Sequence, residues 1–511
     1  MISIKQIVRN VFSNWTGYVV NIVISFFISP FVVHTLGNTG YGIWVLVGSI
    51  TGYLGILDLG MRPAIVKFVS RYKALNDDTM VNKIVNTMLL VFSSIAALVI
   101  LASLVLAYIS PKVVDVPAEF HEQFRLIVII VGLNVAASFP FGVFNAVLNA
   151  LQRFDLNNII EISVFLARSA CIVIFLKLGG GLVSLAVIIL AASLVSFLIK
   201  ARWCLHINKS MEINFKRADK ATLKMITGFS IYTFIIGIAG RINFQTDSIV
   251  IGTFMNPEAI TFFAIGATMI DYLTNLVSHM STTITPVASG LDATRDDERM
   301  RKLLYIGTKY CMIIIFPVGI TFLILGDTFI NLWMGPEYGG PSGTVLTILM
   351  WANFGYLSQF VSGSIFYGLG KVKMLAILNL GMAFFNILIS ILLVKPYGIN
   401  GVAWGTAIPL TVYGTIILPL YVCRTLKISL LEYLMKSYLV PFIPAIIFGA
   451  LIWLSGRFID IKTFVLFWSI IAASFVIYSI FAFFVALEKD HRKFIISKMR
   501  LIWGTKGGQR P

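Results

Sequence analysis

The sequence predicts an all-α protein that crosses a membrane about fourteen times. Its 511 residues are 58% hydrophobic and only 12% charged, whereas soluble domains carry about twice that share of charge. The charges are also clustered, because none occurs between Arg9 and Asp58 and similar gaps recur along the chain. A membrane-spanning helix needs about 20 apolar residues, so each gap holds at least one span.

The gaps, taken in order, predict spans at residues 12–34, 41–69, 84–109, 123–149, 158–178, 182–203, 226–252, 259–289, 303–325, 343–369, 374–395, 401–423, 437–456 and 463–487. An even number places both ends of the chain on one side. Lysine and arginine stay on the cytoplasmic side, and the loops on the side of the two ends hold 29 of them, against 4 on the other side. We therefore expect both termini in the cytoplasm. The same loops account for the net charge of +17, so nucleic acid is not an expected partner.

Short stretches recur in the same order at nearly one offset, which predicts an internal repeat of six helices. The matched pairs are residues 35–38 with 253–256, 150–153 with 368–371, and 181–186 with 398–403. Six helices return the chain to its starting side, so the halves would be related by an axis along the membrane normal, with cargo between them. The predicted parts are an N-terminal six-helix lobe, a cytoplasmic linker loop, a C-terminal six-helix lobe, two additional transmembrane helices and a basic cytoplasmic tail, at residues 1–203, 204–224, 225–423, 424–487 and 488–511.

Three arginines, Arg62, Arg168 and Arg241, lie inside predicted spans. An ionisable group at mid-membrane depth costs about 3 kcal/mol on insertion scales, so it usually faces the interior of the helix bundle and borders a substrate or ion path. Positive charges facing an internal cavity favour an anionic cargo. Arg241 has no acidic residue three or four positions away, so its partner must come from another helix or from the cargo.

Other polar residues in the spans accompany these arginines. Gln245 lies one turn beyond Arg241, and Asn21 belongs to a polar face of the first span. Such residues also hold helices together by hydrogen bonds, but several stripes together favour a water-filled cavity. Four acidic residues are candidates for ion coupling or for charge pairs, with Arg62, Arg168 or Arg241 as the basic partners: Asp58, Glu161, Asp247 and Asp271.

Motifs of enzymes are missing. The pair Gly370-Lys371 lacks the preceding glycine of a phosphate-binding loop, and no H-E-x-x-H or G-x-S-x-G motif occurs. The four cysteines show no metal-ligand spacing. We therefore expect no catalytic residue, no bound metal and no cofactor, and any pumping must be driven by an ion gradient, with H⁺ or Na⁺ as candidate coupling ions, by the membrane potential or by a partner.

Several motifs resemble one family of membrane proteins. They are Leu36-Gly-Asn-Thr-Gly-Tyr-Gly-Ile-Trp44, Leu57-Asp-Leu-Gly60, Leu332-Trp-Met-Gly-Pro-Glu-Tyr338, Tyr367-Gly-Leu-Gly-Lys-Val-Lys373 and Pro396-Tyr-Gly-Ile-Asn-Gly-Val-Ala-Trp404. The chain resembles the Wzx-type oligosaccharide flippases of the multidrug/oligosaccharidyl-lipid/polysaccharide superfamily from the first predicted span through the twelfth.

The resemblance implies a V-shaped transporter in the bacterial inner membrane, with two six-helix lobes as in the multidrug exporters and lipid II flippases of that superfamily. It implies that the cargo is an undecaprenyl-diphosphate-linked oligosaccharide, such as an O-antigen unit of lipopolysaccharide, moved by alternating access. A cationic lumen would hold the diphosphate, and the in-span arginines supply suitable charges. Membrane lipid, a polysaccharide polymerase and a chain-length regulator are the other expected partners.

Three rival functions remain open at this point. A multidrug or cation antiporter of the same fold would favour acidic residues at depth, whereas arginines match or outnumber them here. A lipid II flippase would carry arginines in its first span, and this first span has none. A non-transporting scaffold for glycan assembly would have no reason to keep unpaired charges in its core.

Overall fold

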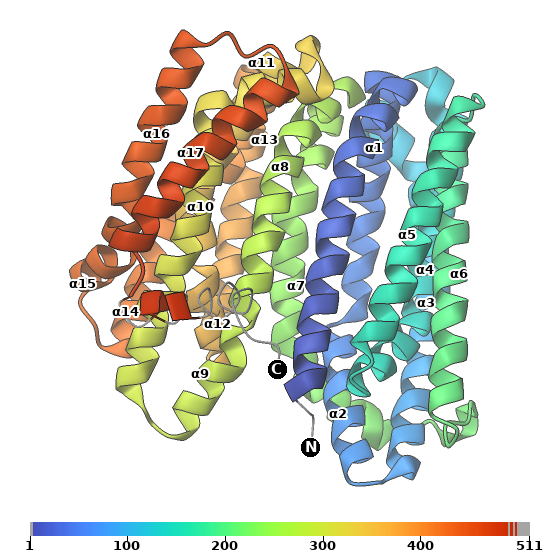
Figure 1. The fold of residues 1–511 in the computed structure, drawn as a ribbon. Helices are drawn as coiled ribbons and strands as arrows, with labels where there is room; N and C mark the ends of the chain where they lie inside the picture. The colour runs from blue at the N-terminus through green and yellow to red at the C-terminus, as the bar shows by residue number, and fades with distance from the viewer. Residues whose placement is uncertain (1–3, 489–490, 494–495, 498–511) are drawn as a thin grey trace, which may run out of the picture. The chain divides into compact units, whose positions relative to one another are not determined.

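The computed structural model describes residues 4–488, 491–493 and 496–497, without the side chains of 4–16, 112, 228–233 and 244. Within these residues the regular structure consists of helices alone, which confirms the predicted all-α class. The first half contains α1 (Ile4–Gly52), η1 (Tyr53–Asp58), α2 (Met61–Ala74), α3 (Asp78–Val113), η2 (Ala118–Phe120), α4 (His121–Ala150), α5 (Phe154–Lys177), α6 (Leu182–Ile207), η3 (Phe215–Arg217) and α7 (Lys220–Phe254). The second contains α8 (Pro257–Thr282), α9 (Ile284–Ala293), α10 (Asp297–Met334), α11 (Pro336–Ser358), α12 (Phe360–Gly368), α13 (Val372–Val412), η4 (Tyr413–Ile417), α14 (Leu418–Leu426), α15 (Leu430–Leu434), η5 (Met435–Leu439), α16 (Val440–Phe458) and α17 (Phe464–Val485) (Figure 1).

Eleven stretches of the described chain are long and apolar enough to cross a membrane. Two of them, residues 17–74 and 372–426, are 58 and 55 residues long and each covers two predicted spans. The 35-residue helix α7 covers the one predicted span that remains, 226–252. The structure is therefore consistent with fourteen predicted spans.

Two glycines divide the longest helices where the sequence predicts loops between spans. Gly37 in α1 has φ 71°, and Gly398 in α13 has φ 57°. This left-handed region suits glycine, because a side chain would collide with the backbone there. Each glycine therefore ends one helix and lets the next begin without a long loop.

The chain packs into two compact units. Residues 1–264 and 373–406 form the first unit, and residues 265–372 and 407–511 form the second. These units do not follow the predicted lobes at residues 1–203 and 225–423, and the six-helix repeat stays a prediction. In the predicted tail, Lys489, Lys498 and Arg500 lie outside the described residues.

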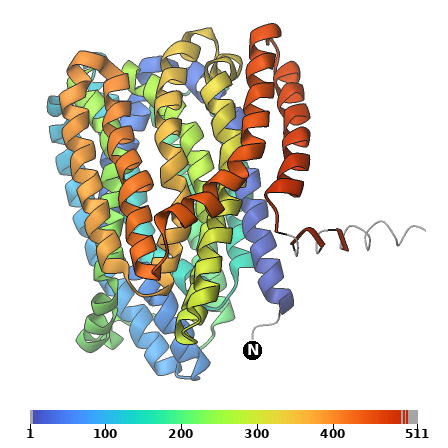
Figure 2. The ribbon, with the colours of Figure 1, turned by 90° about the vertical axis from the view of Figure 1, so that its left-hand side faces the viewer.

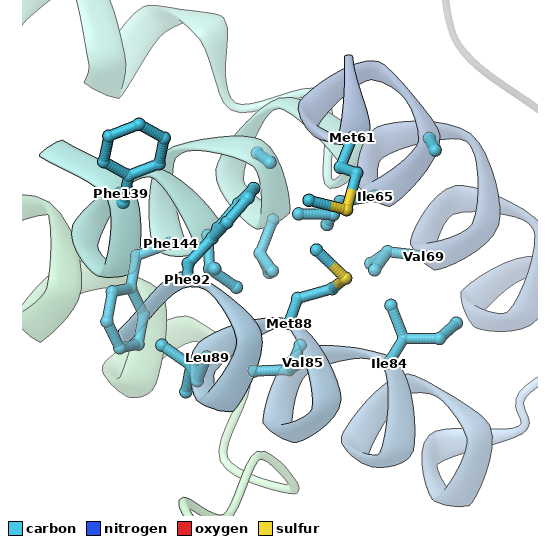
Figure 3. Close-up of a cluster of buried hydrophobic side chains, with 14 of the residues drawn as sticks. Met61, Ile65, Val69, Ile84, Val85, Met88, Leu89, Phe92, Phe139 and Phe144 are labelled. Carbon is cyan, nitrogen blue, oxygen red and sulfur yellow. The ribbon is translucent and has the colours of Figure 1, made fainter. Parts of the chain in front are cut away.

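The core of the first unit lies between α2, α3 and α4. Figure 3 shows Met61 and Val69 of α2 facing Met88 of α3, with Phe92 and Phe139 at one end of the cluster. The rings of Phe92 and Phe139 meet edge to face, with 5.9 Å between their centroids. This packing fixes α2 against α4 and so positions the residues at the start of α2.

Asparagines of α3 hold the linker that precedes α7. The side chain of Asn82 donates to the carbonyl of Ser210 at 2.8 Å and accepts from the amide of Glu212 at 2.8 Å. One turn further, Asn86 donates to the carbonyl of Glu212 and accepts from the amide of Asn214, both at 2.7 Å. An extended segment, 210–214, is thus paired to a helix through side-chain amides.

The last two transmembrane helices pack on α10 in the second unit. Helices α16 and α17 lie side by side (Figure 2), and the hydroxyl of Tyr478 in α17 donates to the carbonyl of Ile313 in α10 at 2.7 Å. Their bounds agree with the predicted spans 437–456 and 463–487.

Candidate functional site

The candidate site begins at a break in the second predicted span. The sequence predicts one helix over 41–69, but the structure changes to the 3₁₀ helix η1 at Tyr53 and ends it at Asp58. Leu59 and Gly60 then adopt φ 50° and 66°, before α2 starts. The prediction of a continuous helix was wrong because two successive left-handed residues end an α-helix. Irregular backbone at membrane depth is tolerated where it is buried in protein or lines a cavity.

Asp58 and Arg62 flank this break and form an ion pair. Arg62 Nε lies 3.4 Å from Asp58 Oδ1, and the two side chains are 38% and 24% exposed. Arg62 also donates to the backbone carbonyl of Ser138 in α4 at 3.1 Å, and its Cζ lies 5.8 Å from the centroid of the Phe139 ring. In the described residues neither Asp58 Oδ1 nor Arg62 Nε has an aligned hydrogen bond. The arginine is therefore held mainly by α4.

Helix α7 brings Arg241 to the same break. A Cβ atom added at Gly55 would lie 3.0 Å from Arg241 Nη2, so the guanidinium lies directly against η1. Asp58 is close enough to interact electrostatically with both Arg62 and Arg241. The Arg241 side chain is exposed, and among the described residues its guanidinium has no hydrogen bond or salt bridge. The site thus combines two arginines with one carboxylate and carries a net positive charge.

Gln245, the next polar residue of α7, lies against the end of α1. A Cβ atom added at Gly52 would lie 3.2 Å from its Cδ. The hydroxyls of Tyr53 and Thr246 are 2.5 Å apart. Small residues at 52 and 55 allow the two helices to approach closely. The prediction that Gln245 follows Arg241 on one face agrees with this contact.

A second cluster lies on another side of α7, around Asp247. The hydroxyl of Thr406 lies 3.0 and 2.8 Å from the two carboxylate oxygens of Asp247, and it accepts a hydrogen bond from the Asn386 amide at 2.8 Å. All three side chains are buried. In the described residues no basic group pairs with Asp247, and a buried carboxylate without one needs a bound cation or a proton.

Three more oxygens near this cluster lack hydrogen bonds. They are buried and have no partner among the described residues: Asn243 Oδ1, Asn386 Oδ1 and Ser390 Oγ. Asn243 is one turn from Asp247, and Ser390 packs against Gly405, which precedes Thr406. Buried polar atoms are usually satisfied, so the surplus of oxygens favours a cation. In the sequence, Asp247 alone indicated this cluster, because its partners Asn386 and Thr406 are more than 130 residues away.

Arg168 and Glu161 of α5 are close enough to interact electrostatically, but each also has another partner. Arg168 Cζ stacks 4.9 Å from the centroid of the Phe165 ring. Glu161 forms its salt bridge with Lys200 of α6, a buried lysine. The predicted span 182–203 contains Lys200 near its end, but the pair was not predicted because Glu161 lies 39 residues away on another helix.

Two further predicted residues lie outside these clusters. Asn21 is exposed on α1, and Asp271 is exposed on α8 in the second unit. In the described part of the chain neither side chain has a hydrogen bond or salt bridge with Asp58, Arg62 or Asp247. The structure therefore brings together Asp58, Arg62, Arg241 and Gln245, and it places Asp247 on the same helix as the last two.

The model of the family described as polysaccharide biosynthesis protein matches residues 7–292, which is more than half of the chain. The chain belongs to this polysaccharide biosynthesis protein family. This member is 21% identical over 408 residues to a Shigella flexneri protein named "Putative O-antigen transporter", a match that covers 78% of this chain and 93% of the relative.

Two solved structures share the fold of this polysaccharide biosynthesis protein. The lipid II flippase MurJ in an inward closed conformation superposes with a TM-score of 0.72 and 16% identity, over 93% of this chain and 98% of MurJ. An inward-facing multidrug transporter of the MATE family gives a TM-score of 0.63 and 15% identity, over 80% and 94%. The family match confirms the predicted resemblance to polysaccharide exporters, and the two superpositions confirm the predicted fold class.

Proposed function

We propose that this protein flips an undecaprenyl-diphosphate-linked oligosaccharide from the cytoplasmic to the outer face of the bacterial inner membrane, with both termini in the cytoplasm. The observation that carries the proposal is Arg241, an exposed guanidinium without a salt bridge among the described residues, beside a broken helix. A fixed positive charge at that depth needs an anion for part of the transport cycle. Family membership supports a polysaccharide precursor as the source of that anion.

Recognition of the diphosphate rests on the two arginines of the break. Guanidinium stays charged and can donate two parallel hydrogen bonds to one phosphate. Arg62 is anchored on α4 by Ser138, whereas Arg241 is free to reach a ligand. Asp58 keeps the empty site from carrying two uncompensated charges, and it would release Arg241 when the diphosphate arrives. The glycan would pass through the polar interior while the polyprenyl chain stays in lipid.

Coupling to an ion gradient rests on Asp247. Helix α7 carries Arg241, which meets η1, and Asp247, which meets Thr406 of α13. Binding of Na⁺ or H⁺ at Asp247 would change how α7 packs on α13, and α7 would transmit that change to Arg241. Asn386 and Ser390 would supply the neutral oxygen ligands if the ion is Na⁺.

The test is surface glycan production in cells that depend on this gene. Arg241→Ala should abolish surface glycan while protein abundance and membrane insertion stay normal. Arg241→Lys should restore only part of it, because an ammonium keeps the charge but loses the bidentate geometry. Arg202→Ala, at an exposed position of α6, is the matched control and should have no effect. Normal glycan in Arg241→Ala cells would remove Arg241 from the site.

A further inference from the structure

The second unit contains a basic cavity that the proposed transport site does not use. It has a volume of about 590 Å³ and lies where α10 meets α14, α15, η5 and α16 (Figure 1). The segments that line it, near residues 298–309, 427–440 and 488, are predicted to face the cytoplasm or adjoin loops that do. Five basic side chains line the cavity: Arg301, Lys302, Lys309, Lys427 and Lys436.

Two of these five are neutralised within the protein. Lys309 Nζ donates to Glu488 at 2.7 Å, and Lys436 Nζ donates to Glu432 at 2.6 Å. Lys309 is buried. Both pairs leave the remaining basic residues of the cavity without an acidic partner of their own.

The other three basic residues give the cavity a positive charge. Arg301 Nε donates to the backbone carbonyl of Leu426 at 3.0 Å. Lys302 and Lys427 are exposed, and among the described residues neither forms a salt bridge. Three carboxylates line the cavity against the five basic side chains, which leaves it with a net positive charge. Lys427 caps the C-terminus of α14 with φ 54°, a left-handed conformation common at helix ends, and this turn places its side chain at the cavity.

An apolar groove adjoins this cavity along α10. It has a volume of about 370 Å³ and runs between α10 and α17, lined by Ile313, Pro317 and Phe475 among others. Ile313 is one turn beyond Lys309, and Leu487 of the groove is next to Glu488 of the cavity. A polar cavity that continues into an apolar groove matches a molecule with an anionic head and a hydrocarbon tail.

The helix beside the cavity also presents apolar side chains outward. Leu431 is 67% exposed, and Leu434 and Met435 are exposed as well. Exposed apolar residues next to basic ones are typical of segments that lie in the membrane interface. The ligand would therefore enter from the lipid rather than from water.

We propose that this cavity and groove bind an anionic phospholipid, with its phosphate among Arg301, Lys302 and Lys427 and an acyl chain between α10 and α17. Basic pockets between transmembrane helices on the cytoplasmic side bind such headgroups. The bound lipid would tie α10 and α15 to α17. This site is separate from Arg241 and independent of the cargo.

The test measures lipid binding to the full-length protein in nanodiscs of phosphatidylcholine with increasing phosphatidylglycerol, by thermal stability and by native mass spectrometry. Phosphatidylglycerol should stabilise the wild type. The double variant Lys302→Ala and Lys427→Ala should bind it about 30-fold more weakly, because the loss of each basic residue near the membrane weakens lipid binding about fivefold. The control Lys371→Ala with Lys373→Ala removes the same charge from another loop and should bind normally.

Two further measurements complete the test. Lys302→Gln and Lys427→Gln, measured singly, replace the double variant if it does not fold, and each should weaken binding about fivefold. Glycerol 3-phosphate at millimolar concentration should not stabilise the protein, because it lacks the acyl chains. Equal lipid binding by the charge variants and the wild type would overturn the proposal. So would equal stabilisation by glycerol 3-phosphate, or displacement of the lipid by undecaprenyl phosphate.

Discussion

At the scale of single residues, the charges inside the membrane divide into groups that pair within the protein and groups that do not. Glu161 pairs with Lys200, and Asp58 pairs with Arg62. Arg241 and Asp247 have no salt bridge in the described residues. A charge left unpaired in a membrane is costly and is kept for function. These two residues therefore carry the transport proposal.

Asp58→Asn should weaken the fold, because it leaves Arg62 without its carboxylate. The pair is about one-third exposed, so the loss should lie between that of a surface pair and that of a buried one, at about 1–3 kcal/mol. The loss of stability would be measured as a lower melting temperature of the protein in detergent. Asp460→Asn, which breaks a pair exposed to solvent with Lys462, is the control and should melt like the wild type. An unchanged melting temperature in Asp58→Asn would mean that the ion pair contributes nothing.

Asp247→Asn should make transport insensitive to the ion gradient without unfolding the protein. The amide keeps the size of the carboxyl and can still accept a hydrogen bond from Thr406, but it cannot bind or release the coupling ion. Transport by the wild type should respond to an imposed Na⁺ or pH gradient, whereas transport by Asp247→Asn should respond to neither. Asp271→Asn, at the exposed carboxylate of α8, should respond like the wild type. The reverse pattern would assign coupling to Asp271.

At the scale of helices, the sequence predicts well where the helices lie, but it predicts only some of the breaks between and within them. Gaps between charges locate the spans, and Gly37 and Gly398 end helices where loops are predicted. The break at Leu59 and Gly60 escaped prediction because leucine is ordinarily a helix former, whereas Leu59 is left-handed in this fold, directly after η1 packs against α4 and α7. The partners Lys200 and Thr406 escaped because contacts between distant segments leave no periodic trace in one sequence.

The linker before α7 offers a prediction about an element. Asn86→Ala removes two hydrogen bonds, to the carbonyl of Glu212 and from the amide of Asn214, and because both of these residues are exposed each loss should cost about 1 kcal/mol. Hydrogen exchange of residues 210–219 should therefore become faster. Ser94→Ala, which removes an exposed bond within α3, is the control. Equal exchange in both variants would contradict the assigned role of Asn86.

At the scale of the whole molecule, loop charge predicts how the chain sits in the membrane. Cysteine labelling in intact cells should find residues 204–224 and 290–302 protected and residues 326–342 accessible, because the first two segments together carry nine lysines and arginines and the third carries none. Accessible label at 204–224 would overturn both the topology and the six-helix repeat. The repeat itself requires the first six spans to superpose on the next six by rotation about the membrane normal.

The measurement that tests the central claim most directly is translocation in liposomes that contain only the purified protein and an undecaprenyl-diphosphate-linked oligosaccharide. A glycan-modifying enzyme added outside reports the fraction of oligosaccharide on the outer leaflet. The account predicts that the wild type exposes oligosaccharide placed on the inner leaflet, that Arg202→Ala does the same, and that Arg241→Ala does not exceed protein-free liposomes. Transport by Arg241→Ala at the rate of the wild type, or no transport by the wild type under any imposed ion gradient, would contradict it.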